Sequence, residues 1–161
     1  MTADTTVRPA GVALLIFLSS CGSIGNPASP PNDFSSGNFS LNIVASASCT
    51  ALADAGRNRS WKVGLVKEGS TVTGSMQGWS DSATVFSQTT LAGTATGSSL
   101  MLAGTIFDTV DGCSTTLCYG AVGTMTATQS GHVISGALNG TLTYDLTTCT
   151  ASDHKVTFTR Q

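Results

Sequence analysis

One stretch of the chain decides the fold: residues 119–144 read YGAVGTMTATQSGHVISGALNGTLTY, two alternating segments on either side of a short turn. In the second segment Ile134, Leu138 and Leu142 share one face, while hydroxyl and amide side chains occupy the other. A period of two residues is typical of a β-strand with one buried face, and the connection at 129–131 is short enough only for a hairpin. The stretch therefore predicts two neighbouring antiparallel strands.

The same pattern extends in both directions from this hairpin. Alternating apolar residues begin near Phe39 and continue to Phe158, and two more short connections fall at 68–70 and 97–98. We count eight candidate strands, which must either close on themselves or leave strand edges exposed. We therefore predict an all-β fold, an eight-stranded antiparallel up-and-down meander barrel, with a two-sheet β-sandwich as the second choice.

This architecture resembles the small up-and-down barrels, of which lipocalins and avidins are familiar members. The resemblance concerns architecture only, because neither family's ligand motif is present, and no binding residue carries over. Small inward positions would either leave room for a ligand or let bulkier neighbours pack, and we favour a filled interior. These positions are Gly74, Gly104, Gly123, Gly136 and Gly140.

The composition excludes some classes of partner. Charged residues make up 10% of the chain, against a usual share of about 25%, whereas 21 Ser and 25 Thr supply much of the polar surface. The net charge is -2 and the basic residues are scattered, so no basic face exists to neutralise phosphates, and we exclude nucleic acid. The hydroxyl-rich outer face also argues against a membrane-spanning barrel, which exposes an apolar band to lipid.

The N-terminal region carries an export signal. Residues 11–18 are apolar or small, too short for a helix of about 20 residues that spans a bilayer, and fit the central region of a secretory signal. The following Leu18-Ser19-Ser20-Cys21 resembles the lipobox of bacterial lipoprotein precursors. The resemblance implies cleavage before Cys21, attachment of lipid such as palmitate to its thiol, and location in the outer membrane. The alternative is an ordinary secretory signal with Cys21 as a free thiol.

Gly, Ser, Pro and Asn dominate the residues after the lipobox, and such sequences form flexible linkers. We therefore predict three parts: a signal peptide over residues 1–20, a lipidated N-terminus and flexible tether over 21–38, and a single β-barrel domain over 39–161. The tether would hold the barrel away from the membrane surface.

Four further cysteines predict two disulfides, since exported proteins favour disulfides. In a closed barrel the end of the first strand lies beside the start of the last, which pairs Cys49 with Cys149. Cys113 and Cys118 would then close a local loop. The alternative is a metal or redox cluster, but there is no C-x-x-C motif and neither histidine has ligand spacing from a cysteine.

The longer connections, near residues 49–58, 79–88, 108–117 and 145–153, would all fall at the end of the barrel opposite the tether. Loops on a rigid scaffold commonly carry binding sites, so we predict a non-enzymatic binding module for a small apolar ligand or a protein partner. The alternative is a structural envelope lipoprotein with a filled barrel and no ligand. The candidate ligand or partner surface is formed by Trp61, Trp79, Phe86, Asp108, Asp111, Tyr119 and Tyr144.

Several patterns that might carry catalysis are weak. Asp153 and His154 would need a nucleophile, and no G-x-S-x-G motif supplies one. Asp108 and Asp111 without an EF-hand loop favour turn capping over Ca²⁺ binding. We interpret His154 as a strand-edge residue and His132 as a solvated one. The sequence therefore predicts no catalytic residue, no metal site and no cofactor.

Overall fold

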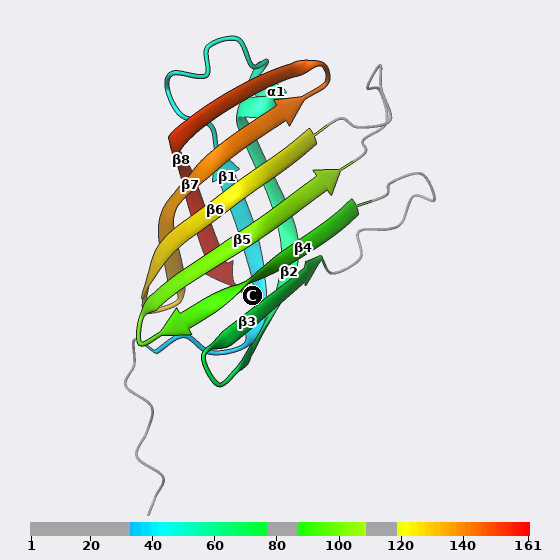
Figure 1. Cartoon of the computed structure of the whole chain (residues 1–161). Helices are drawn as coiled ribbons and strands as arrows, with labels where there is room; N and C mark the ends of the chain where they lie inside the picture. Colours follow the sequence, from blue (N-terminus) through cyan, green and yellow to red (C-terminus); the bar gives the residue numbers. More distant parts are fainter. Residues whose placement is uncertain (1–32, 77–86, 109–118) are drawn as a thin grey trace, which may run out of the picture.

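The computed structural model describes residues 33–76, 87–108 and 119–161, which form a closed barrel (Figure 1). Each strand pairs with the next in an antiparallel manner and β8 pairs with β1, which confirms the predicted up-and-down meander. The elements are β1 (Gly37–Val44), α1 (Asp54–Arg57), β2 (Asn58–Glu68), β3 (Thr71–Met76), β4 (Ser87–Thr96), β5 (Ser99–Asp108), β6 (Tyr119–Ser130), β7 (Val133–Tyr144) and β8 (Thr147–Arg160). Within these described ranges, no helix is long and apolar enough to cross a membrane.

The two ends of the barrel differ in their connections. At one end, here called the short-turn end, two-residue turns follow β2, β4 and β6, as predicted. Gly69, Gly97 and Gly131 take positive φ angles in these turns, a conformation that glycine adopts without steric cost. The opposite end, here called the mouth, holds the β1–β2 loop (residues 45–57) and the β7–β8 turn.

The β7–β8 connection corrects one prediction. Residues 145–153 do not form a long loop, because β7 and β8 are joined by residues 145–146 alone and β8 begins at Thr147. Asp145 takes a φ of 54°, which Asp tolerates better than most residues. The first residues of β8 are mostly threonine, so their alternation has little apolar contrast, and the segment is easily mistaken for a loop.

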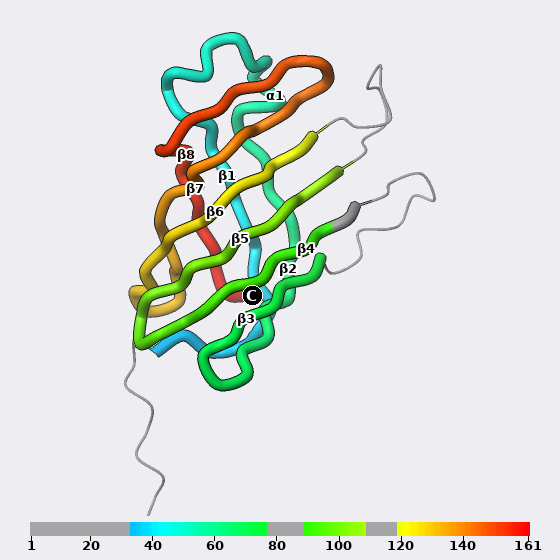
Figure 2. Tube along the Cα trace, in the orientation of Figure 1, coloured from blue at the N-terminus to red at the C-terminus, as the bar shows by residue number. Residues whose placement is uncertain are grey.

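The interior of the barrel is filled with side chains. The inward residues of all eight strands form a single apolar cluster, and Leu41, Val63 and Leu102 have no exposed surface. A hollow wide enough for water would leave accessible surface on the residues around it, so the middle of the barrel is packed rather than hollow. Figure 2 shows the course of the strands around the barrel.

Two of the inward glycines let neighbouring strands approach closely rather than make room for a ligand. A Cβ atom on Gly104 would overlap the backbone carbonyl of Thr90, and one on Gly123 would overlap that of Asn139. Both glycines also have φ angles near +155°, at 158° and 154°, where L side chains are rare. These two positions therefore serve the close approach of neighbouring strands.

A β-bulge in β8 sets which of its residues face inward. The register between β7 and β8 shifts between Leu138 and Gly140, so two residues of β8 lie opposite Asn139. The extra residue reverses the alternation along β8. Consequently Cys149, before the bulge, and His154, after it, both face the interior.

The short-turn end is closed by residues that precede β1. Phe34 is buried and its ring stacks on Phe39, with 6.2 Å between centroids. Its backbone N–H donates to the carbonyl of Gly97 at 3.0 Å, and Arg160 donates to the carbonyl of Ser35 at 2.9 Å. The barrel therefore begins at Gly37, ahead of the predicted boundary at 39, and residues 33–36 of the predicted tether pack against it because Phe34 supplies an apolar side chain.

Candidate binding site

Four inward side chains meet at the mouth, and we call them the mouth cluster: Arg59 and Trp61 of β2, Asp108 of β5 and Tyr119 of β6. Three of them belong to the predicted surface, and the structure brings these three together. They are buried rather than exposed, however, with 3% of Trp61, 7% of Asp108 and none of Tyr119 accessible.

An ion pair across the barrel organises the cluster. Arg59 Nη2 donates to Asp108 Oδ2 at 2.6 Å, and Trp61 Nε1 donates to the same oxygen at 3.2 Å. Because β3 and β4 separate β2 from β5 in the sheet, these contacts cross the interior instead of following the wall. The apolar core therefore ends in a polar layer, in which charge and hydrogen bonds compensate the desolvation of Asp108.

Aromatic contacts complete the cluster. The rings of Trp61 and Tyr119 lie 4.9 Å apart between centroids, and Arg59 Cζ lies 5.7 Å from the centroid of Tyr119. Burial raises the pKa of Tyr119 above its ordinary value of about 10, although the positive charge of Arg59 opposes this effect. The phenol therefore remains protonated and is a hydrogen-bond donor throughout the physiological pH range.

The hydroxyl of Tyr119 is buried, and no residue in the described part of the chain bonds to it. The same holds for Thr89 Oγ1 on β4, which faces inward at the position paired with buried Ile106. A buried polar atom without a partner costs about 1–3 kcal/mol. A third such atom, Oε1 of Gln129, lies at the opposite end of the barrel. The mouth thus retains hydrogen-bonding capacity that the described side chains do not use.

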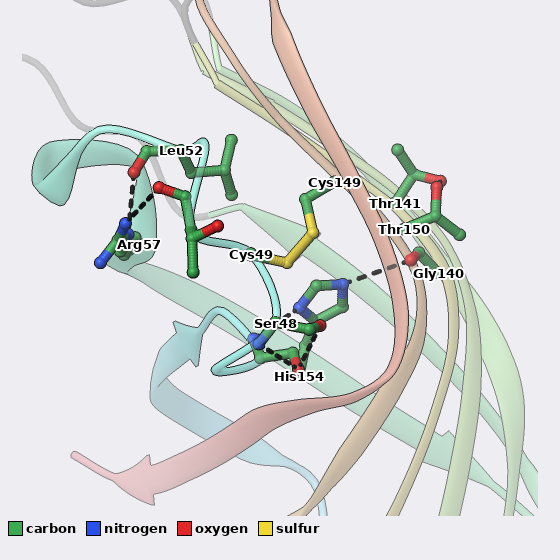
Figure 3. Close-up of a disulfide and its surroundings, with 11 residues drawn as sticks. Ser48, Cys49, Leu52, Arg57, Gly140, Thr141, Cys149, Thr150 and His154 are labelled. Carbon is green, nitrogen blue, oxygen red and sulfur yellow. Dashed lines mark hydrogen bonds between the residues drawn. A yellow bond between two sulfur atoms is a disulfide. The ribbon is translucent and has the colours of Figure 1, made fainter.

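The β1–β2 loop is fixed beside this cluster by a disulfide (Figure 3). Cys49 is bonded to Cys149 across 100 residues of sequence, as predicted from the closure of the barrel. Within the loop, the Arg57 side chain donates to the carbonyls of Leu52 and Thr50 at 2.8 and 2.6 Å. Since Cys49 and Leu52 are both buried, the loop is part of the folded barrel.

His154 joins the loop to the wall of the barrel. Its Nδ1 accepts a hydrogen bond from the backbone N–H of Ser46 at 3.0 Å, and its Nε2 lies 3.3 Å from the carbonyl of Gly140. Burial lowers the pKa of His154, while the Gly140 bond and the charge of Asp153 raise it less. The ring is therefore neutral, with its proton on Nε2.

The two histidine predictions have different outcomes. The strand-edge interpretation of His154 is wrong, because the bulge turns its side chain inward and leaves it without exposed surface. Both ring nitrogens bond to backbone groups, so the ring holds the fold together and is not aimed at a nucleophile. His132 is exposed, as predicted.

The remaining predicted residues divide into two groups. Tyr144 is paired with Tyr119 in the sheet, but its side chain packs beneath α1, where a Cβ atom on Gly56 would overlap it. Tyr144 therefore supports the loop. The others lie outside the described residues: Cys21, Trp79, Phe86, Asp111, Cys113 and Cys118. Among the described residues, no three His, Cys, Asp or Glu side chains gather in a way that could hold a metal ion.

Arg59 and Thr89 belong to the site but not to the predicted surface. The signal for Arg59 was its position two residues before Trp61, which continues the inward series of β2. Thr89 carries the same signal, two residues before buried Leu91 on β4.

Fold and site together define a small, filled β-barrel with a polar and aromatic mouth. No protein-family model, curated protein or solved structure matches this chain.

Proposed function

We propose that this protein is a lipid-anchored lipoprotein of the bacterial cell envelope that binds a small molecule at the mouth of its barrel without catalysing a reaction. In this proposal Cys21 carries acyl chains such as palmitate and inserts them into the outer membrane. Two or three chains provide stable anchoring, because one acyl chain alone gives only reversible binding.

This proposal rests on one observation: the N-terminal segment and the mouth cluster lie at opposite ends of the barrel. Residues 33–36 pack at the short-turn end, beside Gly97, whereas Arg59 and Asp108 lie at the other end (Figure 1). A lipid anchor ahead of residue 33 would therefore hold the short-turn end toward the membrane. The mouth would then face away from it, accessible to a ligand or partner.

The chemistry of the mouth supports binding rather than catalysis. The interior is packed, and at the mouth the Tyr119 and Thr89 hydroxyls have no partner among the described residues. The acid–base groups nearby are engaged in the structure: Asp108 by Arg59, and His154 by Ser46 and Gly140.

Intact-mass spectrometry of the full-length chain expressed in a bacterium and purified from its membranes tests the anchor. We expect a polypeptide that begins at Cys21 and carries acyl chains, and a soluble, unacylated product from the Cys21→Ser variant. Cys113→Ser is the matched control, which should keep the acyl mass. An unacylated wild-type chain, or a Cys21 thiol that reacts freely with an alkylating reagent, would contradict the proposal.

The filled interior favours a second candidate function, a structural envelope lipoprotein without a ligand. Native mass spectrometry of the same preparation separates the two. A small molecule retained by the wild-type barrel supports binding. A bare barrel favours the structural role.

A further inference from the structure

We propose that the outer surface of β4–β7, here called the uncharged face, is an interface through which two copies of this chain pack side by side. The partner is thus a second copy of the chain, and its binding does not depend on a ligand at the mouth. Three properties of the uncharged face point to this role: the lack of charge, the exposed apolar side chains and the size.

The uncharged face has no charged side chain within the described residues. β3–β7 together hold a single Asp, Glu, Lys or Arg residue, Asp108, and its side chain faces the interior. β2 and β8, in contrast, expose Lys62, Asp153 and Lys155. Charges of both signs normally cover a surface that stays in water. The wall formed by β4–β7, in front in Figure 1, lacks this cover.

Large apolar side chains are exposed on this face. Met101 and Phe107 of β5 and Val122 of β6 are 51%, 37% and 49% accessible. Phe107 is paired with Gly120 and Thr105 with Val122, so the Phe107 and Val122 side chains are diagonal neighbours on adjacent strands. The centres of protein interfaces are depleted in charge and enriched in aromatic residues and methionine. The uncharged face has both features.

The polar side chains of the uncharged face suit a second copy of the same face. They are mostly threonines, such as the exposed Thr124 and Thr126. In a two-fold symmetric dimer the same patch of both copies meets. A hydroxyl both donates and accepts hydrogen bonds, so two hydroxyls satisfy each other, whereas two ammonium groups or two carboxylates repel. A charged partner, in turn, would find no opposite charge on this face.

The face is large enough for a dimer. β4 and β5 have ten residues each, and β6 and β7 have twelve. At about 4.8 Å between strands and about 3.4 Å per residue, four such strands cover roughly 19 by 34 Å, or about 650 Å². A stable interface takes about 800 Å² from each partner. The uncharged face is therefore comparable in size to the surface that one protomer contributes to a stable dimer.

The position of the face on the side of the barrel fits two copies anchored in one membrane, because both short-turn ends can then point toward the same surface. Barrel strands are inclined by about 35–45° to the barrel axis. Strands of two faces related by a two-fold axis parallel to the barrels therefore cross at about 70–90°, which is the orthogonal class of sheet packing. Confinement to a membrane also raises the effective concentration of the two copies. Only this compatibility depends on the proposed anchor.

Sedimentation equilibrium of the purified full chain over a range of concentrations tests the interface. We expect a monomer–dimer equilibrium for the wild type. Val122→Lys should raise the dissociation constant about tenfold or more, because it introduces like charges from both copies into the interface.

Val66→Lys is the matched control, since it adds the same charge elsewhere on the barrel. Val66 is 51% exposed on the outer side of β2, outside the uncharged face, so this variant should dimerise as the wild type does. Both variants retain the N-terminal segment. A difference between them therefore cannot come from acyl chains that share a detergent micelle.

Oxidation of Met101 by hydrogen peroxide gives a second test on the wild-type chain. Peroxide converts an exposed methionine to its sulfoxide, and a second copy on the uncharged face would shield this side chain. The oxidation rate, followed by mass spectrometry, should fall as the protein concentration rises through the dissociation constant. This test stands even if Val122→Lys does not fold.

The outcomes separate the interface from the proposed function. A wild-type chain that is monomeric at every concentration would overturn the dimer. An equal response of the two lysine variants, or a Met101 oxidation rate that does not change with concentration, would overturn the role of the uncharged face. Absence of acyl chains or of a retained small molecule contradicts the proposed function and leaves dimerisation through this face intact.

Discussion

The two ends of this barrel are built by different means. The short-turn end depends on glycine turns and on the contact of Phe34 with Phe39, both local in sequence, and also on hydrogen bonds from Arg160 to Ser35. The mouth depends on contacts between distant residues: the Cys49–Cys149 disulfide and the ion pair of Arg59 with Asp108. The mouth is thus held by a covalent cross-link and an ion pair, neither of which is found at the short-turn end within the described residues.

The largest effect should come from the disulfide at the mouth. Replacing Cys49 and Cys149 together with alanine removes a cross-link over 100 residues, and loop entropy predicts a loss of about 4–5 kcal/mol in the free energy of unfolding. Urea denaturation measures this loss. Replacing Cys113 and Cys118 with alanine is the control for cysteine removal, and we expect a smaller loss, because the disulfide predicted between these two residues would close a much shorter loop. Equal losses would mean that the mouth has no special dependence on its cross-link.

The next effect tests the short-turn end. Phe34→Ala removes a buried ring, and because Phe→Ala substitutions in cores cost roughly 3–5 kcal/mol, we expect about 3 kcal/mol for a residue at the margin of the core. Urea denaturation gives the magnitude, and the Trp61 indole N–H signal should keep its position. A shifted Trp61 signal would show that a change at the short-turn end alters the mouth, and that the two ends are not independent.

The same contrast explains what the sequence could predict about the fold. Alternation and glycine turns are local signals, so the strands and the turns at Gly69, Gly97 and Gly131 were predictable. The Cys49–Cys149 pair followed from closure of the barrel. The start of β8 was missed because its threonines resemble a loop, and the bulge opposite Asn139 has no signature in the sequence.

The site was predictable only in part. Residue type and position near the mouth identified Trp61, Asp108 and Tyr119. Whether these side chains contact one another depends on how far the strands tilt and shift around the barrel. Arg59 was not predicted, because a charged residue on the inner face of a strand is rare without a partner. Its partner lies 49 residues away, beyond the reach of any local pattern.

A smaller effect is expected from the ion pair. Asp108→Asn keeps the shape of the side chain and leaves Arg59 without its counter-charge. Breaking a fully buried pair costs about 3–5 kcal/mol, and because 23% of the Arg59 side chain is exposed we expect about 2 kcal/mol. Asp54→Asn is the control, since this carboxylate is fully exposed in its pair with Arg57, and its unfolding midpoint in urea should not change. Similar effects of the two substitutions would argue that the mouth cluster contributes no more than a surface contact.

The smallest effect is the dependence of stability on pH through His154. Burial holds the pKa of His154 in the folded protein below the value of about 6.5 expected for the unfolded chain. The unfolded chain therefore takes up a proton more readily than the folded protein. The stability that neutral His154 contributes is complete above pH 6.5 and is lost as the pH falls through the folded pKa. In the neutral ring, Nδ1 accepts a hydrogen bond from the backbone N–H of Ser46. A proton on Nδ1 would point at this N–H and break the bond.

Urea midpoints measured from pH 7.5 down to pH 5 test this dependence. The wild-type chain should become less stable across this range. The amide of Ser46 should also have a lower protection factor against hydrogen exchange at the acid end, after correction for the intrinsic rate at each pH, because it loses its acceptor. His154→Gln cannot titrate and should flatten the pH dependence. His132→Gln, at an exposed position, should retain it. If the urea midpoint of His154→Gln depends on pH as strongly as that of the wild-type chain, protonation of another group governs this dependence. The mouth is then no more sensitive to acid than the short-turn end.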